Sequence, residues 1–85
     1  MFYVYVLRCK DGSFYTGYTI NLKKRLKLHN EGKASKYTRS RLPAELVAKW
    51  PFANKSEAMK YEIVFKSLPR NSKMKRLQES VMQSN

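Results

Sequence analysis

One carboxylate of this sequence occupies a position where a charged group is costly. Glu62 falls in a segment with helical spacing, on the side that also carries Ala58, Tyr61 and Phe65. A carboxylate that faces apolar side chains must be paired or must bind a cation. Two interpretations are open: an ion pair with a neighbouring Lys or Arg, or a functional role.

A second segment adds two candidate partners for this carboxylate. Arg25 and His29 stand four residues apart in a stretch with helical spacing, and both flank the apolar stripe of Leu22 and Leu26. Taken singly, an inward His or Arg is more often structural, since an Arg stem can lie along apolar surface. An inward Arg, His and Glu together exceed what the core of so small a protein requires.

These residue types suit the hydrolysis of a phosphodiester. That reaction needs a base to deprotonate water, a cation to stabilise the pentacovalent phosphate, and a metal with at least one protein ligand. Tyr5 and Tyr15, ten residues apart, are further candidates. A phenolate is a strong base but scarce at neutral pH because the phenol pKa is about 10, and a cation such as Arg25 would favour it. With only six acids in the chain, one metal ion is favoured over two.

The pattern resembles the GIY-YIG nuclease family. Its two motifs have counterparts in YVY at Tyr3–Tyr5 and YTG at Tyr15–Gly17, followed by Arg25, His29 and Glu62 in order. The stretches YTGYT, KYTR and SEAMKYE are similar to those of the small stand-alone bacterial members, and the resemblance covers nearly the whole chain. A tyrosine replaces the usual glycine of the first motif, and a threonine replaces the usual isoleucine of the second.

The resemblance implies a role for each matched residue. Glu62 would hold a single divalent cation, Mg²⁺ or Mn²⁺, and Arg25 would contact the scissile phosphate. Tyr5, Tyr15 and His29 would position or deprotonate the attacking water, and which of the three is the base stays open. The implied activity is that of a metal-dependent endonuclease acting on DNA.

The tyrosines of the two motifs belong to a predicted hairpin. Its turn, Lys10-Asp11-Gly12, is expected to be a three-residue loop with the glycine in a left-handed conformation. In that register Tyr5, Tyr15 and Gly17 share one face of the sheet, with Gly17 opposite Tyr5. A two-residue turn would place the tyrosines on opposite faces and split the site. The missing side chain of Gly17 is expected to leave room for a phosphate.

The remaining elements predict an α+β fold. Hydrophobic spacing, the positions of Pro and Gly, and the N-cap residues Asn21 and Asn54 predict three strands and three helices. Their order, β-β-α-β-α-α, favours a three-stranded, mainly antiparallel sheet flanked by helices in a single domain over 1–85. The predicted strands are 2–9, 13–18 and 46–50, the last ended by Pro51, and the predicted helices are 22–30, 55–67 and 73–82.

The charge of the chain predicts an anionic partner. Eighteen Lys and Arg against six Asp and Glu give a net charge of +12, which favours nucleic acid, DNA or possibly RNA. The loop after the first predicted helix mixes cations with an aromatic ring, which suits phosphate contacts and stacking on an unpaired base, although a solvated loop is the alternative. Together with Gly17, the candidate nucleic-acid contacts are Lys33, Lys36, Tyr37, Thr38, Arg39 and Arg41; Lys66, Lys73, Lys75 and Arg76 are assigned to general electrostatic attraction.

Composition limits the other classes of function. No apolar run approaches the roughly 20 residues of a membrane-spanning helix, and the N-terminus lacks the pattern of a signal peptide, so a cytoplasmic protein without a membrane partner is expected. Cys9 is the only cysteine, which excludes an intramolecular disulfide.

Two competing functions explain part of the pattern. A non-catalytic nucleic-acid-binding module on the same fold, or a structural protein of a ribonucleoprotein particle, explains the charge but not an inward Glu62. For an endonuclease this small, little surface is available for reading duplex sequence. Branched, flapped or single-stranded substrates are therefore expected, and a protein partner could supply specificity.

Overall fold

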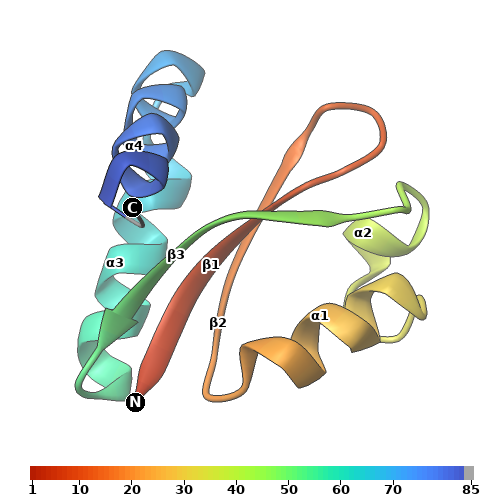
Figure 1. Ribbon diagram of the computed structural model, residues 1–85, viewed down its shortest axis with the longest axis horizontal. Coiled ribbons are helices and arrows are strands. Elements are labelled where there is room, and N and C mark those ends of the chain that lie inside the picture. Colours follow the sequence, from red (N-terminus) through yellow and green to blue (C-terminus); the bar gives the residue numbers. More distant parts are fainter. Residues whose placement is uncertain (84–85) are drawn as a thin grey trace.

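The computed structural model describes residues 1–83 as a three-stranded sheet with helices on both sides (Figure 1). The strands pair antiparallel in the order β2-β1-β3. The predicted α+β fold and its order are confirmed, with one short helix added. The strands are β1 (Phe2–Arg8), β2 (Phe14–Thr19) and β3 (Glu45–Phe52), and the helices are α1 (Leu22–Asn30), α2 (Lys36–Arg39), α3 (Lys55–Ser67) and α4 (Arg70–Gln83).

The hairpin of β1 and β2 has the predicted three-residue turn. The Cys9 amide donates to the Ser13 carbonyl (2.8 Å), and the Gly12 amide donates to the Cys9 carbonyl (2.9 Å). Gly12 has φ +84°, a left-handed conformation that a side chain would strain. Tyr5 consequently lies opposite Gly17, which confirms the register and places the two motif tyrosines on one face of the sheet.

Strand β3 is longer than predicted at both ends. It begins at Glu45, continues through Pro51 and pairs with β1 as far as Phe52. Pro51 is tolerated because β3 is an edge strand, where a residue without an amide proton can face away from the neighbouring strand. The expectation that Pro51 ends the strand is therefore wrong.

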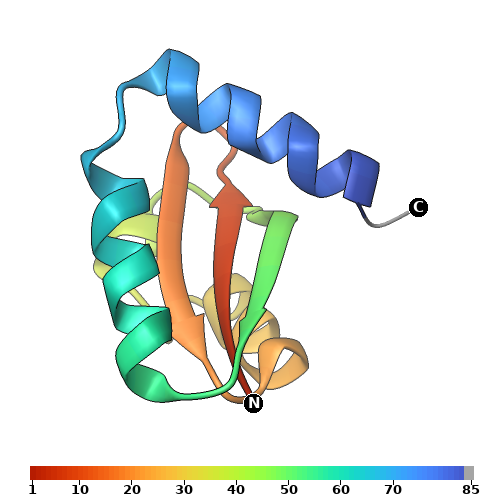
Figure 2. The same ribbon diagram turned by 90° about the vertical axis from the view of Figure 1, so that its left-hand side faces the viewer.

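Both faces of the sheet are covered by helices. Figure 1 shows α1 and α2 on one side and α3 and α4 on the other, and Figure 2 shows α3 running alongside β2. A bulge in β3 between the pairs Val6–Ala48 and Leu7–Leu46 shifts the alternation of side chains, so that Leu46 and Ala48 face opposite sides. Val6, Ala48, Phe65 and Leu77 are buried toward α3 and α4, whereas Tyr5, Leu7 and Ala44 form a second cluster with Leu22 and Leu26 of α1.

Helices α1 and α3 have the predicted limits because both begin at side-chain caps. The Asn21 side chain accepts a hydrogen bond from the Lys24 amide (3.1 Å), and the Asn54 side chain accepts one from the Glu57 amide (2.9 Å). Each bond satisfies one of the amides that a helix N-terminus leaves without an internal partner. These caps fix where Arg25 in α1 and Glu62 in α3 stand along their helices.

Two helical segments differ from the prediction. Helix α2 is a single turn capped by Ser35, inside the region expected to be a basic loop. Helix α4 begins at Arg70 rather than residue 73, because the Pro69 carbonyl accepts a hydrogen bond from the Lys73 amide (3.0 Å) and proline is well tolerated at a helix start. Within residues 1–83, no helix has the length and apolar character needed to cross a bilayer.

Candidate active site

Four of the five residues matched to the motifs border one cleft at the β2 edge of the sheet. The helices α1 and α3 lie on opposite faces of the sheet and reach this edge from both sides (Figures 1 and 2). The cleft has a volume of about 270 Å³ and is lined by Tyr5, Tyr15, Gly17, Tyr18, Arg25 and Glu62. This cleft, called the tyrosine cleft below, joins three phenols, a guanidinium and a carboxylate from separate segments.

The fifth residue, His29, lies behind the tyrosine cleft. Its side chain has no exposed surface. Its Nε2 is 2.9 Å from the Tyr5 hydroxyl, and its Nδ1 is 2.9 Å from the Thr38 hydroxyl. The Tyr15 ring packs against the imidazole edge to face, with 5.0 Å between the ring centroids. His29 does not line the cleft, so it has no direct access to a water bound there and reaches the cleft only through the Tyr5 hydroxyl.

The hydrogen-bond chain fixes the tautomer of His29. The Thr38 hydroxyl donates to the Ser35 carbonyl (3.3 Å), which can only accept. A hydroxyl has one proton, so Thr38 must accept from the Nδ1–H of His29. Burial, and secondarily the charge of Arg25, lower the pKa of His29 and keep the imidazole neutral. Its Nε2 is then an acceptor, and the Tyr5 hydroxyl donates to it.

Tyr5 is a neutral phenol in this arrangement. Its side chain is 2 % exposed, and this burial raises its pKa well above the ordinary value. Tyr15 and Glu62 also raise the pKa of Tyr5, whereas Arg25 opposes the rise. Arg25 thus favours the phenolate as expected, but desolvation outweighs the nearby guanidinium and Tyr5 keeps its proton.

Glu62 borders the cleft and also forms an ion pair. Its side chain is 17 % exposed, and an oxygen lies 3.8 Å from the Lys66 ammonium one helical turn further along α3. The ion-pair interpretation is therefore confirmed, and the functional role of Glu62 stays a prediction. Residues 1–83 contain no cluster of three or more His, Cys, Asp or Glu side chains that could hold a metal. A single carboxylate still fits Mg²⁺, which commonly binds one or two carboxylates and completes its shell with water and substrate phosphate.

Comparison with known proteins agrees with this geometry. Residues 1–76 match the model of the GIY-YIG catalytic domain. The chain belongs to the GIY-YIG family. Membership places it in a family of endonucleases and implies a nucleic-acid substrate. GIY-YIG nucleases typically use divalent metals.

Proteins similar to this chain occur in bacteria. The chain is 55 % identical over 71 residues to the UPF0213 protein BH0048 of Halalkalibacterium halodurans, covering 84 % of this chain and 76 % of that protein. Over 77 residues it is 53 % identical to a UPF0213 protein of Bacillus licheniformis, covering 91 % and 79 %. The solution structure of BH0048 aligns with a TM-score of 0.61 at 51 % identity, covering 92 % of this chain and 84 % of that one. The solution structure of the E. faecalis protein EF2693 aligns with a TM-score of 0.62 at 44 % sequence identity. This alignment covers 91 % of this chain and 82 % of that one.

The glycine of the second GIY-YIG motif makes room for Tyr5. A Cβ at Gly17 would lie 2.8 Å from the Tyr5 hydroxyl oxygen and 3.0 Å from its Cζ. Gly17 borders the cleft, but the space above it is taken by the phenol ring rather than left free for a phosphate. The glycine thus allows the Tyr5 hydroxyl to reach His29.

Replacing Gly17 by Ala should destabilise the protein through this contact. Overpacking of a buried site typically costs about 1–3 kcal/mol, and the hydroxyl end of Tyr5 must move. The cost should be smaller in a Tyr5→Phe background, where the closest atom is missing. Urea unfolding of the two single variants and the double variant measures this coupling. Equal costs of Gly17→Ala in both backgrounds would contradict the packing described.

The predicted nucleic-acid contacts separate into exposed and buried residues. Lys33, Lys36, Tyr37 and Arg39 are exposed. Thr38 has no exposed surface, so it supports His29 and cannot contact nucleic acid as predicted.

Sequence reasoning missed two residues beside the GIY-YIG motifs. Tyr18 lines the tyrosine cleft, although alternation along a strand assigns it to the face opposite Tyr15. Lys66 pairs with Glu62, and the spacing of four residues on a helix was the signal that could have found it.

Proposed function

We propose that this GIY-YIG chain is a metal-dependent endonuclease that hydrolyses phosphodiester bonds of DNA. The proposal is carried by the tyrosine cleft, where Tyr5, Arg25 and Glu62 meet and the Tyr5 hydroxyl is bonded to a buried, neutral His29. A binding module needs cations, which the chain has in excess. It does not need a carboxylate in the same cleft as a guanidinium, or a buried phenol–imidazole pair.

Tyr5 and His29 provide a path for the proton of the attacking water. As the water oxygen bonds to phosphorus, its proton passes to the Tyr5 oxygen, and the Tyr5 proton passes to Nε2 of His29. Tyr5 is neutral before and after the step, so its raised pKa is no obstacle. Both nitrogens of His29 are already hydrogen-bonded, and the ring needs no reorientation as it becomes charged. The bond from phosphorus to the leaving oxygen breaks, and that oxygen takes a proton from solvent.

Arg25 and Glu62 have complementary roles in this proposal. Arg25 would bind the non-bridging oxygens of the phosphate, because a guanidinium can donate two parallel hydrogen bonds to it. Glu62 would hold Mg²⁺ or Mn²⁺. When bound, such an ion polarises the phosphate and stabilises charge on the leaving oxygen.

A cleavage assay tests the proposed function. The purified chain is incubated with end-labelled single-stranded, duplex and branched DNA in Mg²⁺, in Mn²⁺ and in chelator. We expect cleavage of at least one substrate with either metal and none with chelator. Salt-sensitive binding of all three substrates without any product would instead establish the non-catalytic binding module.

The pH dependence of cleavage should report the ionisation of His29. Only the neutral imidazole can accept the Tyr5 proton, so the rate should rise with pH as His29 loses its proton. Because the pKa of His29 is lowered, the midpoint of this rise should lie below about pH 6.5, the ordinary value for histidine. Single-turnover rates at saturating protein measure the profile. A rate that keeps rising toward pH 10 would indicate a phenolate base and contradict the path through His29.

A further inference from the structure

A second cleft adjoins the tyrosine cleft along β2. It has a volume of about 290 Å³ and is lined by Phe14, Tyr15, Thr16, Tyr37, Lys66 and Lys73. Tyr15 borders both clefts, and Lys66 also forms the ion pair with Glu62 of the first. A group bound in this second cleft, called the Tyr37 cleft below, would be an immediate neighbour of one in the tyrosine cleft.

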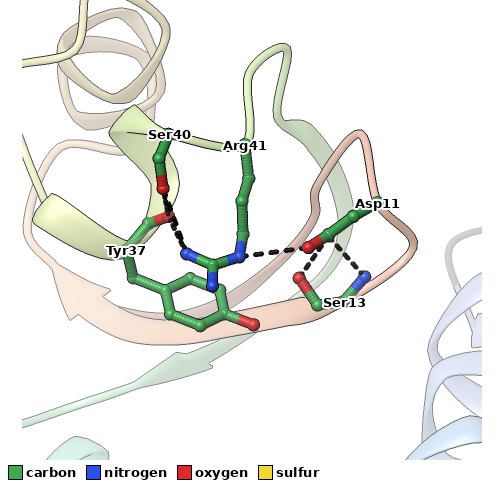
Figure 3. Close-up of polar contacts among 5 residues, drawn as sticks. All are labelled: Asp11, Ser13, Tyr37, Ser40 and Arg41. Carbon is green, nitrogen blue, oxygen red and sulfur yellow. Dashed lines mark hydrogen bonds and ion pairs between the residues drawn. The ribbon is translucent and has the colours of Figure 1, made fainter.

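The Tyr37 ring is held in place before any ligand binds. The Arg41 guanidinium lies over this ring, 4.0 Å from its centroid. Figure 3 shows how Arg41 is anchored: it donates to the Asp11 carboxylate (3.1 Å), to the Tyr37 carbonyl (2.8 Å) and to the Ser40 hydroxyl (3.2 Å). Tyr37 nevertheless remains 37 % exposed. A fixed and exposed aromatic ring is a low-entropy surface for stacking.

Cations gather on the opposite side of the Tyr37 cleft. Lys66 comes from the last turn of α3 and Lys73 from the first turn of α4. Arg70 adds a third positive charge nearby, with its guanidinium 5.0 Å from the centroid of the Phe14 ring. The residues lining the cleft are therefore aromatic, hydroxyl-bearing or cationic. Aromatic rings beside ammonium groups are the usual chemistry for binding single-stranded nucleic acid.

We propose that the Tyr37 cleft binds the unpaired nucleotide next to the scissile phosphate, with its base against the Tyr37 ring and its phosphate on Lys66 and Lys73. This inference rests on the proposed function for the location of the scissile phosphate. The volume is near the lower end of pockets that hold small organic ligands, which suits one nucleotide. A base inside a duplex exposes only its edges, because both faces of its ring are stacked on neighbouring bases. It has no free face for the Tyr37 ring, so the cleft selects single-stranded DNA or an unpaired flap.

Binding measurements with Tyr37 variants test the stacking contact. The probes are a fluorescein-labelled oligothymidine and a labelled blunt duplex, with chelator present so that cleavage does not contribute. Tyr37→Leu should weaken binding of the single strand about tenfold and that of the duplex about twofold or less. Tyr37→Phe keeps the ring and should bind like the wild type. Equal weakening of both probes by Tyr37→Leu, or no weakening, would overturn the proposal.

A matched pair of lysine variants tests the phosphate contact. Lys73→Gln removes a charge that lines the Tyr37 cleft, whereas Lys75→Gln removes one that is exposed two residues further along the same helix. For the single strand, the logarithm of the association constant falls linearly with the logarithm of the salt concentration. Lys73→Gln should make this negative slope shallower by about 0.7. Lys75→Gln removes only general electrostatic attraction and should change the slope by less than half as much. Equal slopes for the two variants would show that Lys73 does not contact the phosphate in the Tyr37 cleft.

These outcomes separate the second cleft from the nuclease activity. If binding shows the Tyr37-dependent preference for single strands but DNA is never cut, the nucleotide site is supported and the proposed function is wrong. If DNA is cut but Tyr37→Leu binds single strands as well as the wild type does, the proposed function is supported and the nucleotide site is wrong. Thermal unfolding followed by circular dichroism confirms that each variant is folded at the assay temperature.

Discussion

Replacing Glu62 by Gln should lower the rate of DNA cleavage roughly a thousandfold. The amide has nearly the same shape but no charge to hold a divalent ion, and metal stabilisation of a phosphoryl transition state is worth several kcal/mol. Binding of DNA should persist, because the change removes a negative charge from the cleft and leaves Lys66 without this ion-pair partner. Single-turnover cleavage in Mg²⁺ and binding in chelator measure the two effects separately.

A matched acid provides the control for Glu62→Gln. Glu79 is exposed on α4, so Glu79→Gln removes the same charge without touching the cleft. This control should cut DNA at the wild-type rate. If Glu62→Gln also cuts at that rate in Mg²⁺, the carboxylate has no part in the reaction and the proposed metal ligand is wrong.

Tyr5→Phe should lower the cleavage rate by about 10²- to 10⁴-fold, the range typical of a lost general base. The phenylalanine ring fills the same space but cannot pass a proton to His29. The variant should also lose stability, since Nε2 of His29 loses its hydrogen-bond donor and an unsatisfied buried group costs about 1–3 kcal/mol. Cleavage is therefore measured well below the melting temperature of the variant. Any residual activity should lack the increase in rate with pH that the wild type shows as His29 loses its proton.

Tyr61→Phe is the matched control for Tyr5→Phe. Tyr61 packs against Trp50 and Phe65 in the cluster under α3 and α4, on the other face of the sheet. Losing its hydroxyl should not change the cleavage rate or its pH dependence. If Tyr5→Phe and Tyr61→Phe had the same activity, the hydroxyl of Tyr5 would not carry the proton.

Much of the fold followed from local chemistry. The caps at Asn21 and Asn54 set the starts of α1 and α3, and the turn ending in Gly12 set the hairpin register. Helix α2 could not be found in the same way, because a single turn has too few residues to show a hydrophobic period. The path of β3 through Pro51 depends on β3 being an edge strand, which is a property of the assembled sheet.

The sequence predicted which residues meet at the candidate site, but not their surroundings. Spacing identified Tyr5, Arg25, His29 and Glu62 as a set, yet the depth of His29 and the raised pKa of Tyr5 depend on how α1 and α2 close over the sheet. The second cleft depends on distance in space rather than spacing along the chain. It joins the start of β2 to α2, to the end of α3 and to the start of α4. Lys66 and Lys73 therefore appeared in the sequence as ordinary surface charges.

The most direct test of the account is the fate of the oxygen atom of water. DNA cut by the wild-type chain in Mg²⁺ and ¹⁸O-labelled water should carry one ¹⁸O on each newly formed terminal phosphate, as measured by mass spectrometry of the products. The Glu62→Gln and Tyr5→Phe chains should form almost none of this labelled product in the same time. DNA recovered intact with the wild-type chain, or new ends whose phosphates lack the label, would contradict a cleft that activates water for phosphodiester hydrolysis.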